Sequence, residues 1–237
     1  MRFGIVVFPG TWSDTDCYYS VSAILKQKAR FIWHKDTDLS GIDCVILPGG
    51  FSYGDHLRAG AIAAFSPIMK SVTTFALKGG LVIGICNGFQ ILCEAGLLPG
   101  ILRRNQHLQF RCEWVNLKIN NPSTPFTIDI PQNRTLRIPI AHGEGSYYAN
   151  DQVIAQLHAN NQIVFQYCDR QGAVVNNSNP NGSIENIAGI INSKGNILGM
   201  MPHPERACES LLGSIDGLYI LQSIIQSSSP ARGNSEK

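Results

Sequence analysis

One cysteine of the chain stands where a strand pattern changes abruptly into a helix pattern. The apolar run over residues 81–85 stops at Cys86, and a helical pattern over residues 87–94 begins at once. Gly84 and Gly88 lie two residues to either side, so the spacing is G-x-C-x-G. This spacing is typical of a nucleophile elbow, a sharp strand-to-helix turn that exposes a reactive side chain above a sheet. The alternative is a packed core thiol, since free cysteine is among the most buried residue types.

A cysteine nucleophile needs a base, and one of the six histidines is well placed to be that base. His203 precedes Pro204, which disfavours helical backbone at the histidine and predicts an extended conformation. Side chains two residues apart in an extended chain point to the same side, so Glu205 is expected beside His203 and able to orient its imidazole. The alternative is a surface turn without a chemical role. The presence of a cysteine elbow favours the catalytic interpretation.

Attack on a carbonyl also needs backbone donors for the oxyanion. The amide of Asn87 lies at the start of the predicted helix, and Gly50 ends a neighbouring strand where no side chain blocks its approach. The segment His142-Gly143-Glu144-Gly145 follows another predicted strand. It could form a second His–Glu pair, a metal site or a backbone clamp for substrate. Its glycines favour the clamp, and the lack of nearby Cys or Asp disfavours the metal.

These residues need a framework that brings them together. Strands are predicted at 2–8, 29–33, 43–47 and 81–85, and helices from Ser13 to near Lys28, from about Pro67 to Gly79 and at 87–94. Further strands are predicted at 110–119, 136–141, 163–167, 187–191 and 197–200, and a last helix at 211–225. Alternating strands and helices indicate a parallel sheet covered on both faces. We expect an α/β, flavodoxin-like fold with an open, mostly parallel sheet and some antiparallel strands in the second half.

The composition of the 237 residues indicates an ordinary globular protein. Hydrophobic residues make up 44% and charged residues 15%, and the net charge is +2 without a dense Lys/Arg cluster, so no nucleic-acid or membrane partner is expected. The seven cysteines are scattered without a C-x-x-C pair, which predicts a cytoplasmic protein without a metal site. No phosphate-binding glycine motif is present, so no nucleotide cofactor is expected on this chain. One domain is predicted over 1–226, followed by a disordered tail at 227–237.

Four segments carry a resemblance to a known family. They are GGFSYGDHLRAGAIA (49–63), GICNGFQILCEAGLLPG (84–100), AHGEG (141–145) and GMMPHPERA (199–207). In this order they resemble the triad-type (class I) glutamine amidotransferases, and more specifically the glutaminase subunits of phosphoribosylformylglycinamidine (FGAM) synthase. The similarity extends from about residue 2 to residue 226. One departure is Trp12-Ser13, where the family pattern leads us to expect an Asn-Cys-like pair.

The resemblance implies a role for each site residue. Cys86 would be the nucleophile, His203 the acid and base, and Glu205 the carboxylate that orients the histidine. The oxyanion donors would be Gly50 and Asn87. The residues expected to hold the substrate glutamine are Gln90, Gly143 and Glu144.

The resemblance also implies a division of labour between subunits. This chain would hydrolyse glutamine to glutamate and ammonia. A large synthetase subunit would use ATP and Mg²⁺ to convert formylglycinamide ribonucleotide (FGAR) to formylglycinamidine ribonucleotide (FGAM), in purine biosynthesis. A small subunit would bridge the two. The alternatives are another Cys-elbow hydrolase or an amidotransferase with a different acceptor, a flavodoxin-type binding module, and an inactive amidotransferase kept as a scaffold.

Overall fold

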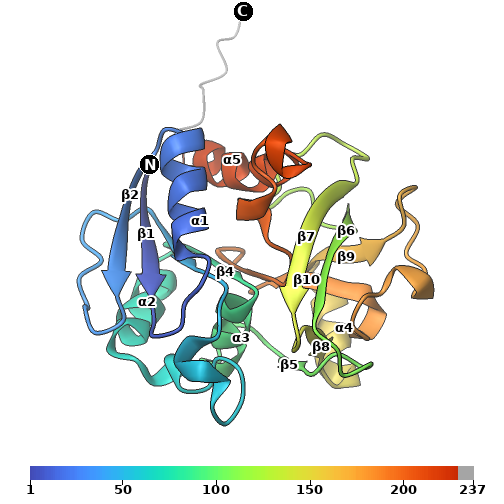
Figure 1. Ribbon diagram of the computed structural model, residues 1–237, viewed down its shortest axis with the longest axis horizontal. Helices are drawn as coiled ribbons and strands as arrows, with labels where there is room; N and C mark the ends of the chain where they lie inside the picture. Colours follow the sequence, from blue (N-terminus) through green and yellow to red (C-terminus); the bar gives the residue numbers. More distant parts are fainter. Residues whose placement is uncertain (229–237) are drawn as a thin grey trace, which may run out of the picture.

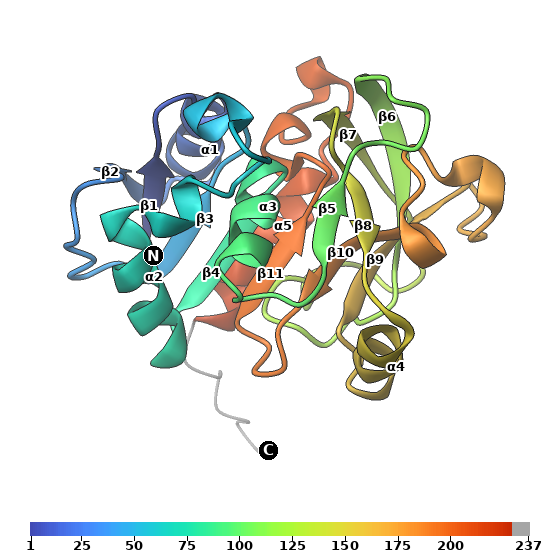
Figure 2. The ribbon, with the colours of Figure 1, turned by 90° about the horizontal axis from the view of Figure 1, so that it is seen from below.

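The computed structural model describes residues 1–228. Its nine principal strands are β1 (Arg2–Val7), β2 (Lys28–Trp33), β3 (Cys44–Leu47), β4 (Leu81–Ile85), β6 (Arg111–Ile119), β7 (Leu136–His142), β9 (Ile163–Cys168), β10 (Ile187–Ile191) and β11 (Ile197–Met200). They form one sheet with the order β2-β1-β3-β4-β11-β10-β9-β6-β7 (Figures 1 and 2). A separate two-stranded sheet pairs β5 (Ile101–Arg103) with β8 (Ser146–Tyr148).

The main sheet has a parallel part and an antiparallel part. β2, β1, β3, β4 and β11 run parallel, and β3 and β4 are almost entirely buried, as expected of strands covered on both faces. β10, β9, β6 and β7 continue the sheet with antiparallel pairing. The predicted α/β class, with antiparallel strands in the second half, is therefore confirmed. The position of β11 beside β4 was not predicted, and it determines where the site forms.

Helices lie on both faces of the parallel part. α1 (Asp14–Tyr19) and α5 (Gly217–Ser227) lie on one side, and α2 (Pro67–Leu77) and α3 (Asn87–Glu94) lie on the other (Figures 1 and 2). α4 (Asp151–Ala159) lies beside the antiparallel part (Figure 2). Pro67 occupies the first turn of α2, as predicted. Within residues 1–228, no helix is long and apolar enough to cross a membrane.

Several predicted helix boundaries were wrong. The helix expected from Ser13 to near Lys28 ends earlier, because α1 continues as a π-helical turn only to Ile24 and β2 already begins at Lys28. The predicted helix at 211–225 is divided, since a 3-10 turn ends at Gly213 with a φ of 104° and α5 begins only at Gly217.

The predictions also omitted three short elements and a terminal boundary. β5, β8 and α4 were not predicted, although Asn150 caps α4 by accepting a hydrogen bond from Val153 N at 2.9 Å. Of the tail predicted at 227–237, Ser227 belongs to α5 and Ser228 caps that helix. The rest of the tail lies outside the described residues. The single domain over 1–226 stays a prediction.

Candidate active site

Cys86 lies in the sharp turn between β4 and α3. Its backbone has φ 52° and ψ −106°, a strained conformation of the kind that functional sites retain. The flanking glycines permit the turn, because a Cβ on Gly88 would come within 1.9 Å of the Leu47 carbonyl oxygen and one on Gly84 within 2.6 Å of the Gly88 oxygen. The G-x-C-x-G spacing therefore has a steric cause. It lets α3 pack directly against the ends of β3 and β4.

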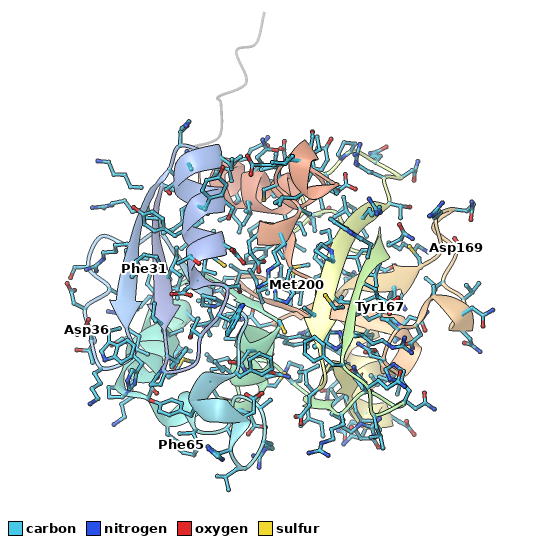
Figure 3. The ribbon with its side chains drawn as sticks, in the orientation of Figure 1. Phe31, Asp36, Phe65, Tyr167, Asp169 and Met200 are labelled. Atoms are coloured by element: carbon cyan, nitrogen blue, oxygen red, sulfur yellow. The ribbon has the colours of Figure 1, made fainter. Side chains whose placement is uncertain are left out.

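The strand order brings the histidine to the cysteine. β11 is the parallel neighbour of β4, so the two strands end at the same edge of the sheet. Cys86 N donates to the Met200 carbonyl at 2.8 Å, and Figure 3 shows Met200 near the centre of the molecule. His203 follows three residues later, and its N–H donates to the Pro139 carbonyl of β7 at 2.8 Å. Three strands thus determine the position of this histidine.

His203 and Glu205 form a buried pair. The Nδ1 of His203 lies 2.6 Å from Oε1 of Glu205, and the two side chains are 3% and 1% exposed. Pro204 keeps the backbone of His203 out of the helical region, with φ −101° and ψ 86°. The reason for the contact differs from the predicted one, however. Glu205 lies in a single 3-10 turn over Pro204–Arg206, and this turn, rather than a continuous extended chain, brings the carboxylate back to the imidazole.

The thiol and the imidazole face the same small space. A Cβ on Gly49 would lie 2.7 Å from Cε1 of His203 and 3.3 Å from Cβ of Cys86. Nε2 of His203 is buried and has no hydrogen-bond partner among residues 1–228. The Cys86 Sγ donates weakly to the Ala141 carbonyl at 3.6 Å. An unpaired ring nitrogen beside a thiol is the arrangement that proton transfer between them requires.

Electrostatics favour an ion pair between His203 and Glu205. Burial alone lowers the pKa of His203, but the charges of Glu205 and Cys86, together with the hydrogen bond to Glu205, raise it to about 10. Burial alone likewise raises the pKa of Glu205, whereas the charge of His203 and its hydrogen bond, followed by Arg206, bring the net value below its usual range. The carboxylate thus holds a proton on the imidazole.

Three of the predicted oxyanion and glutamine-binding residues are joined by hydrogen bonds that begin next to Cys86. Asn87 is the first residue of α3, so its N–H has no partner within the helix. The Asn87 amide group donates to Oε1 of Gln90 at 2.9 Å, and the Gln90 amide group donates to the Glu144 carbonyl at 2.6 Å. These bonds connect the elbow to the 143–145 segment. Gly50 has a φ of 152° and lies against the backbone of Thr11 and Trp12.

Ser13, in the segment that departs from the family pattern, supports the strand end next to the site. Its Oγ accepts from Gly49 N at 2.9 Å, and its own N–H donates to the Gly49 carbonyl at 3.1 Å. Ser13 is completely buried, whereas Trp12 is 71% exposed. Ser13 therefore holds the glycine that borders both His203 and Cys86. Sequence reasoning left the role of this loop open.

The segment 142–145 does not form a second His–Glu pair. The ring of His142 is buried and contacts Oδ1 of Asn105 at 3.1 Å and the amide of Asn181 at 3.4 Å. The Glu144 carboxylate instead forms an ion pair with Arg104 at 3.4 Å. The Gly143 carbonyl accepts from Asn105 N at 2.9 Å and the Glu144 carbonyl from the Gln90 amide at 2.6 Å, and the backbone clamp stays a prediction. Within residues 1–228, no group of three or more His, Cys, Asp or Glu could hold a metal ion.

The burial of His142 predicts a pH dependence of stability. Burial and the charge of His203 lower the pKa of His142 to about 3. Between pH 3 and 6.5 the unfolded chain therefore binds a proton that the folded chain excludes, so acidification destabilises the fold. The effect should be about 1.5 kcal/mol between pH 6.5 and 5. His203 contributes in the opposite sense, since its stabilisation is lost as the pH rises above 6.5 towards 10.

Urea unfolding at pH 6.5 and 5 would measure this effect. The free energy of unfolding should decrease between these two pH values by about 1.5 kcal/mol less in His142→Gln than in the unchanged chain. Subtracting one decrease from the other cancels the contributions of the titrating groups that both chains share. The exposed His158 provides the control, because His158→Gln should keep the full decrease. Equal decreases in the two variants would contradict the assignment.

The fold and this arrangement of Cys, His and Glu place the chain in the class of glutamine amidotransferases. Residues 1–217 match the family model described as the CobB/CobQ-like glutamine amidotransferase domain. The chain is 60% identical over 225 residues to the phosphoribosylformylglycinamidine synthase subunit PurQ of Moorella thermoacetica. The aligned region covers 95% of each of the two chains. It is 54% identical to PurQ of Salinibacter ruber, covering 94% of this chain and 95% of that one. The chain belongs to the PurQ family of glutamine amidotransferases.

A solved structure supports the same relationship. The chain superimposes with a TM-score of 0.84 on a chain of the structure described as PurLQS from Thermotoga maritima. The two are 42% identical, and the match covers 95% of this chain and 97% of that one. The agreement extends over almost the whole fold, including the antiparallel part of the sheet.

Proposed function

We propose that this chain is the glutaminase of a phosphoribosylformylglycinamidine synthase. Its task is to hydrolyse glutamine to glutamate and ammonia, and to pass the ammonia to a synthetase subunit that converts FGAR to FGAM with ATP. The observation that carries the proposal is the buried His203–Glu205 pair, whose free ring nitrogen borders the Cys86 elbow. The identity of the acceptor rests on the PurQ relatives.

The proposed chemistry assigns a role to each group. The Cys86 sulfur attacks the side-chain amide carbon of glutamine, and His203 protonates the departing ammonia. A water then hydrolyses the glutamyl thioester, with His203 accepting its proton. Glu205 keeps the imidazole oriented and stabilises its charged form. The backbone N–H groups of Asn87 and Gly50 are the proposed donors to the oxyanion in both steps.

The proposed glutamine site lies between the elbow helix and the 143–145 segment. Gln90 reaches from α3 to the Glu144 carbonyl, so the side chains and carbonyls of these two regions can hold the polar end of the substrate. Gly143 leaves open space, because a Cβ there would meet only Phe110 at 3.6 Å. Gln90, Gly143 and Glu144 are therefore the proposed substrate-binding residues.

The partners of this chain are proposed from its relatives. PurQ is named as a subunit of phosphoribosylformylglycinamidine synthase, and the T. maritima structure is described as PurLQS. We therefore assign this chain a large synthetase partner, which uses ATP and Mg²⁺, and a small bridging subunit. Transfer of ammonia between the sites calls for a closed path across the interface. The cytoplasm is the proposed location, since glutamine and ATP are both available there.

Glutamate release, measured with and without the two partner subunits, tests this function. The chain alone should release glutamate slowly, because an uncoupled glutaminase would waste glutamine. Addition of the cognate large and small subunits, with FGAR and ATP, should raise the rate by about 10²-fold or more, as expected when an interface completes a catalytic geometry. FGAM should form in equal amount. A high rate from the isolated chain would contradict the coupling. The absence of any glutamate release from the complex would contradict the function.

A further inference from the structure

A short loop places a carboxylate beside the elbow, outside the set of residues assigned above. The loop is the 3-10 turn over Ser52–Asp55, in which Tyr53, Gly54 and Asp55 all have positive φ. Oδ1 of Asp55 accepts a hydrogen bond from the Asn87 amide group at 3.4 Å, and Asn87 is the residue next to Cys86. The loop therefore brings Asp55 into contact with the first residue of α3.

This loop is anchored at several points. Ser52 N donates to Oδ1 of Asn87 at 3.2 Å, and Tyr53 N donates to the Pro9 carbonyl at 2.7 Å. The Tyr53 hydroxyl group also lies 2.8 Å from Nδ1 of His34. Because the positions before Asp55 are fixed, the carboxylate is held in place and pre-organised for a partner.

Asp55 has no positively charged partner among the described residues. It takes part in none of their ion pairs, although it is half-buried. Burial, and then the negative charge of Glu144, raise its pKa to about 6. Glu144 itself forms an ion pair with Arg104, whose side chain is largely exposed. The negative charges of Asp55 and Glu144 act on one another, so a cation bound between them would be stabilised.

Three buried side-chain atoms have no hydrogen-bond partner among residues 1–228. They are Nε2 of His203, Oε2 of Glu205 and Oγ of Ser52. Buried polar atoms in native proteins are almost always paired, so each of these atoms calls for an explanation. The histidine borders the thiol, and the serine belongs to the loop that carries Asp55. A polar molecule bound between the thiol and this loop could satisfy such atoms.

The size of glutamine fits this arrangement. Its amide carbon, which would meet the Cys86 sulfur, is separated from the α-ammonium group by about 5 Å in an extended chain. Asn87 and Gln90 lie at the start of the elbow helix, and they contact Asp55 and the Glu144 backbone respectively. A substrate with its amide at the thiol can therefore extend its other end towards the two carboxylates.

We propose that Asp55, with Glu144 beside it, binds the α-ammonium group of glutamine and so selects glutamine over amides that lack this group. The inference rests on the proposed glutaminase function and adds a specificity-determining residue to it. A primary ammonium group suits the site better than a metal ion, because the two carboxylates have no third Cys, His, Asp or Glu near them among the described residues.

Kinetics of the assembled complex, with two substrates, would test this role. Glutamine is compared with glutaramate, which has the same amide but no α-amino group. For the unchanged complex, kcat/KM should be about 10²-fold higher with glutamine, as a charge-assisted hydrogen bond suggests. In Asp55→Asn, kcat/KM for glutamine should fall about 10²-fold, mostly through KM. The value for glutaramate should change by less than about threefold, so the preference for glutamine disappears.

Controls separate recognition from folding and from the proposed function itself. Asp36→Asn changes an exposed aspartate at the edge of the molecule, away from Met200, whose carbonyl accepts from Cys86 N (Figure 3), and should keep the preference. The rate at which iodoacetamide alkylates Cys86 reports the integrity of the elbow and should be unchanged in Asp55→Asn. An equal fall for both substrates, or an unchanged preference for glutamine, would overturn the role of Asp55. An unchanged complex that hydrolyses no glutamine would instead refute the glutaminase function.

Discussion

Replacing Cys86 by alanine is expected to lower kcat for glutamine hydrolysis by about 10⁴-fold or more, since removal of a nucleophile leaves only binding and oxyanion stabilisation. The complex should still form FGAM when ammonium chloride replaces glutamine, because the synthetase site is on another chain. Measurement of both reactions on one preparation distinguishes loss of the nucleophile from loss of assembly. A Cys86→Ala complex that still hydrolyses glutamine would refute the assignment.

Covalent labelling provides an independent test of the same residue. A glutamine-analogue electrophile should add one adduct to the unchanged chain and none to Cys86→Ala, as measured by intact mass. Cys112 is the matched control, because it is the exposed cysteine among the seven. Cys112→Ala should label as the unchanged chain does. An adduct that persists in Cys86→Ala but is absent from Cys112→Ala would show that exposure, rather than the elbow, determines reactivity.

Replacing Glu205 by glutamine is expected to lower kcat by about 10²–10⁴-fold, as loss of the orienting carboxylate does in other triads. The side chain keeps its size, and its amide can still contact Nδ1 of His203. The negative charge is removed, however, so the burial that opposes protonation is no longer offset. The pKa of His203 should fall far below the value near 10 that the intact pair maintains.

NMR titration of the His203 ring would separate this effect from simple misfolding. The ring should titrate at a much lower pH in Glu205→Gln than in the unchanged chain. Glu209 provides the control, since it is a nearby carboxylate that contacts the Tyr19 hydroxyl at 3.2 Å instead of the histidine. Glu209→Gln should keep both the titration and the activity. An unchanged titration in Glu205→Gln would show that the carboxylate does not determine the charge of the imidazole.

The three proposed catalytic residues could be predicted because each stands in a local pattern. The glycines around Cys86 reflect a packing requirement between adjacent elements, and Pro204 restricts the backbone of His203 directly. Such constraints act over a few residues and therefore remain visible in a single sequence. The fold class was predictable for the same reason, since alternating strand and helix periods are local properties.

Other features of the site depend on contacts between distant segments. Ser13 supports Gly49 across 36 residues, and Asp55 meets Asn87 across 32. No spacing rule connects these pairs, and polar residues in loops are common enough to carry no signal alone. The contact between His142 and Asn105 across 37 residues is of the same kind. The order of strands in the sheet was also beyond local patterns, because it depends on which edges meet after collapse.

The place of β11 between β4 and β10 has a consequence for how the chain matures during its synthesis. The first half of the chain can pair β4 with β3, but the other edge of β4 stays open until β11 has been made. At about 5–20 residues per second, that wait is on the order of 10 s. An unpaired strand edge in mid-sheet is a site for misassociation, so the nascent chain is expected to depend on chaperones during this interval. The same delay keeps the thiol apart from its histidine, because His203 follows β11 in the chain.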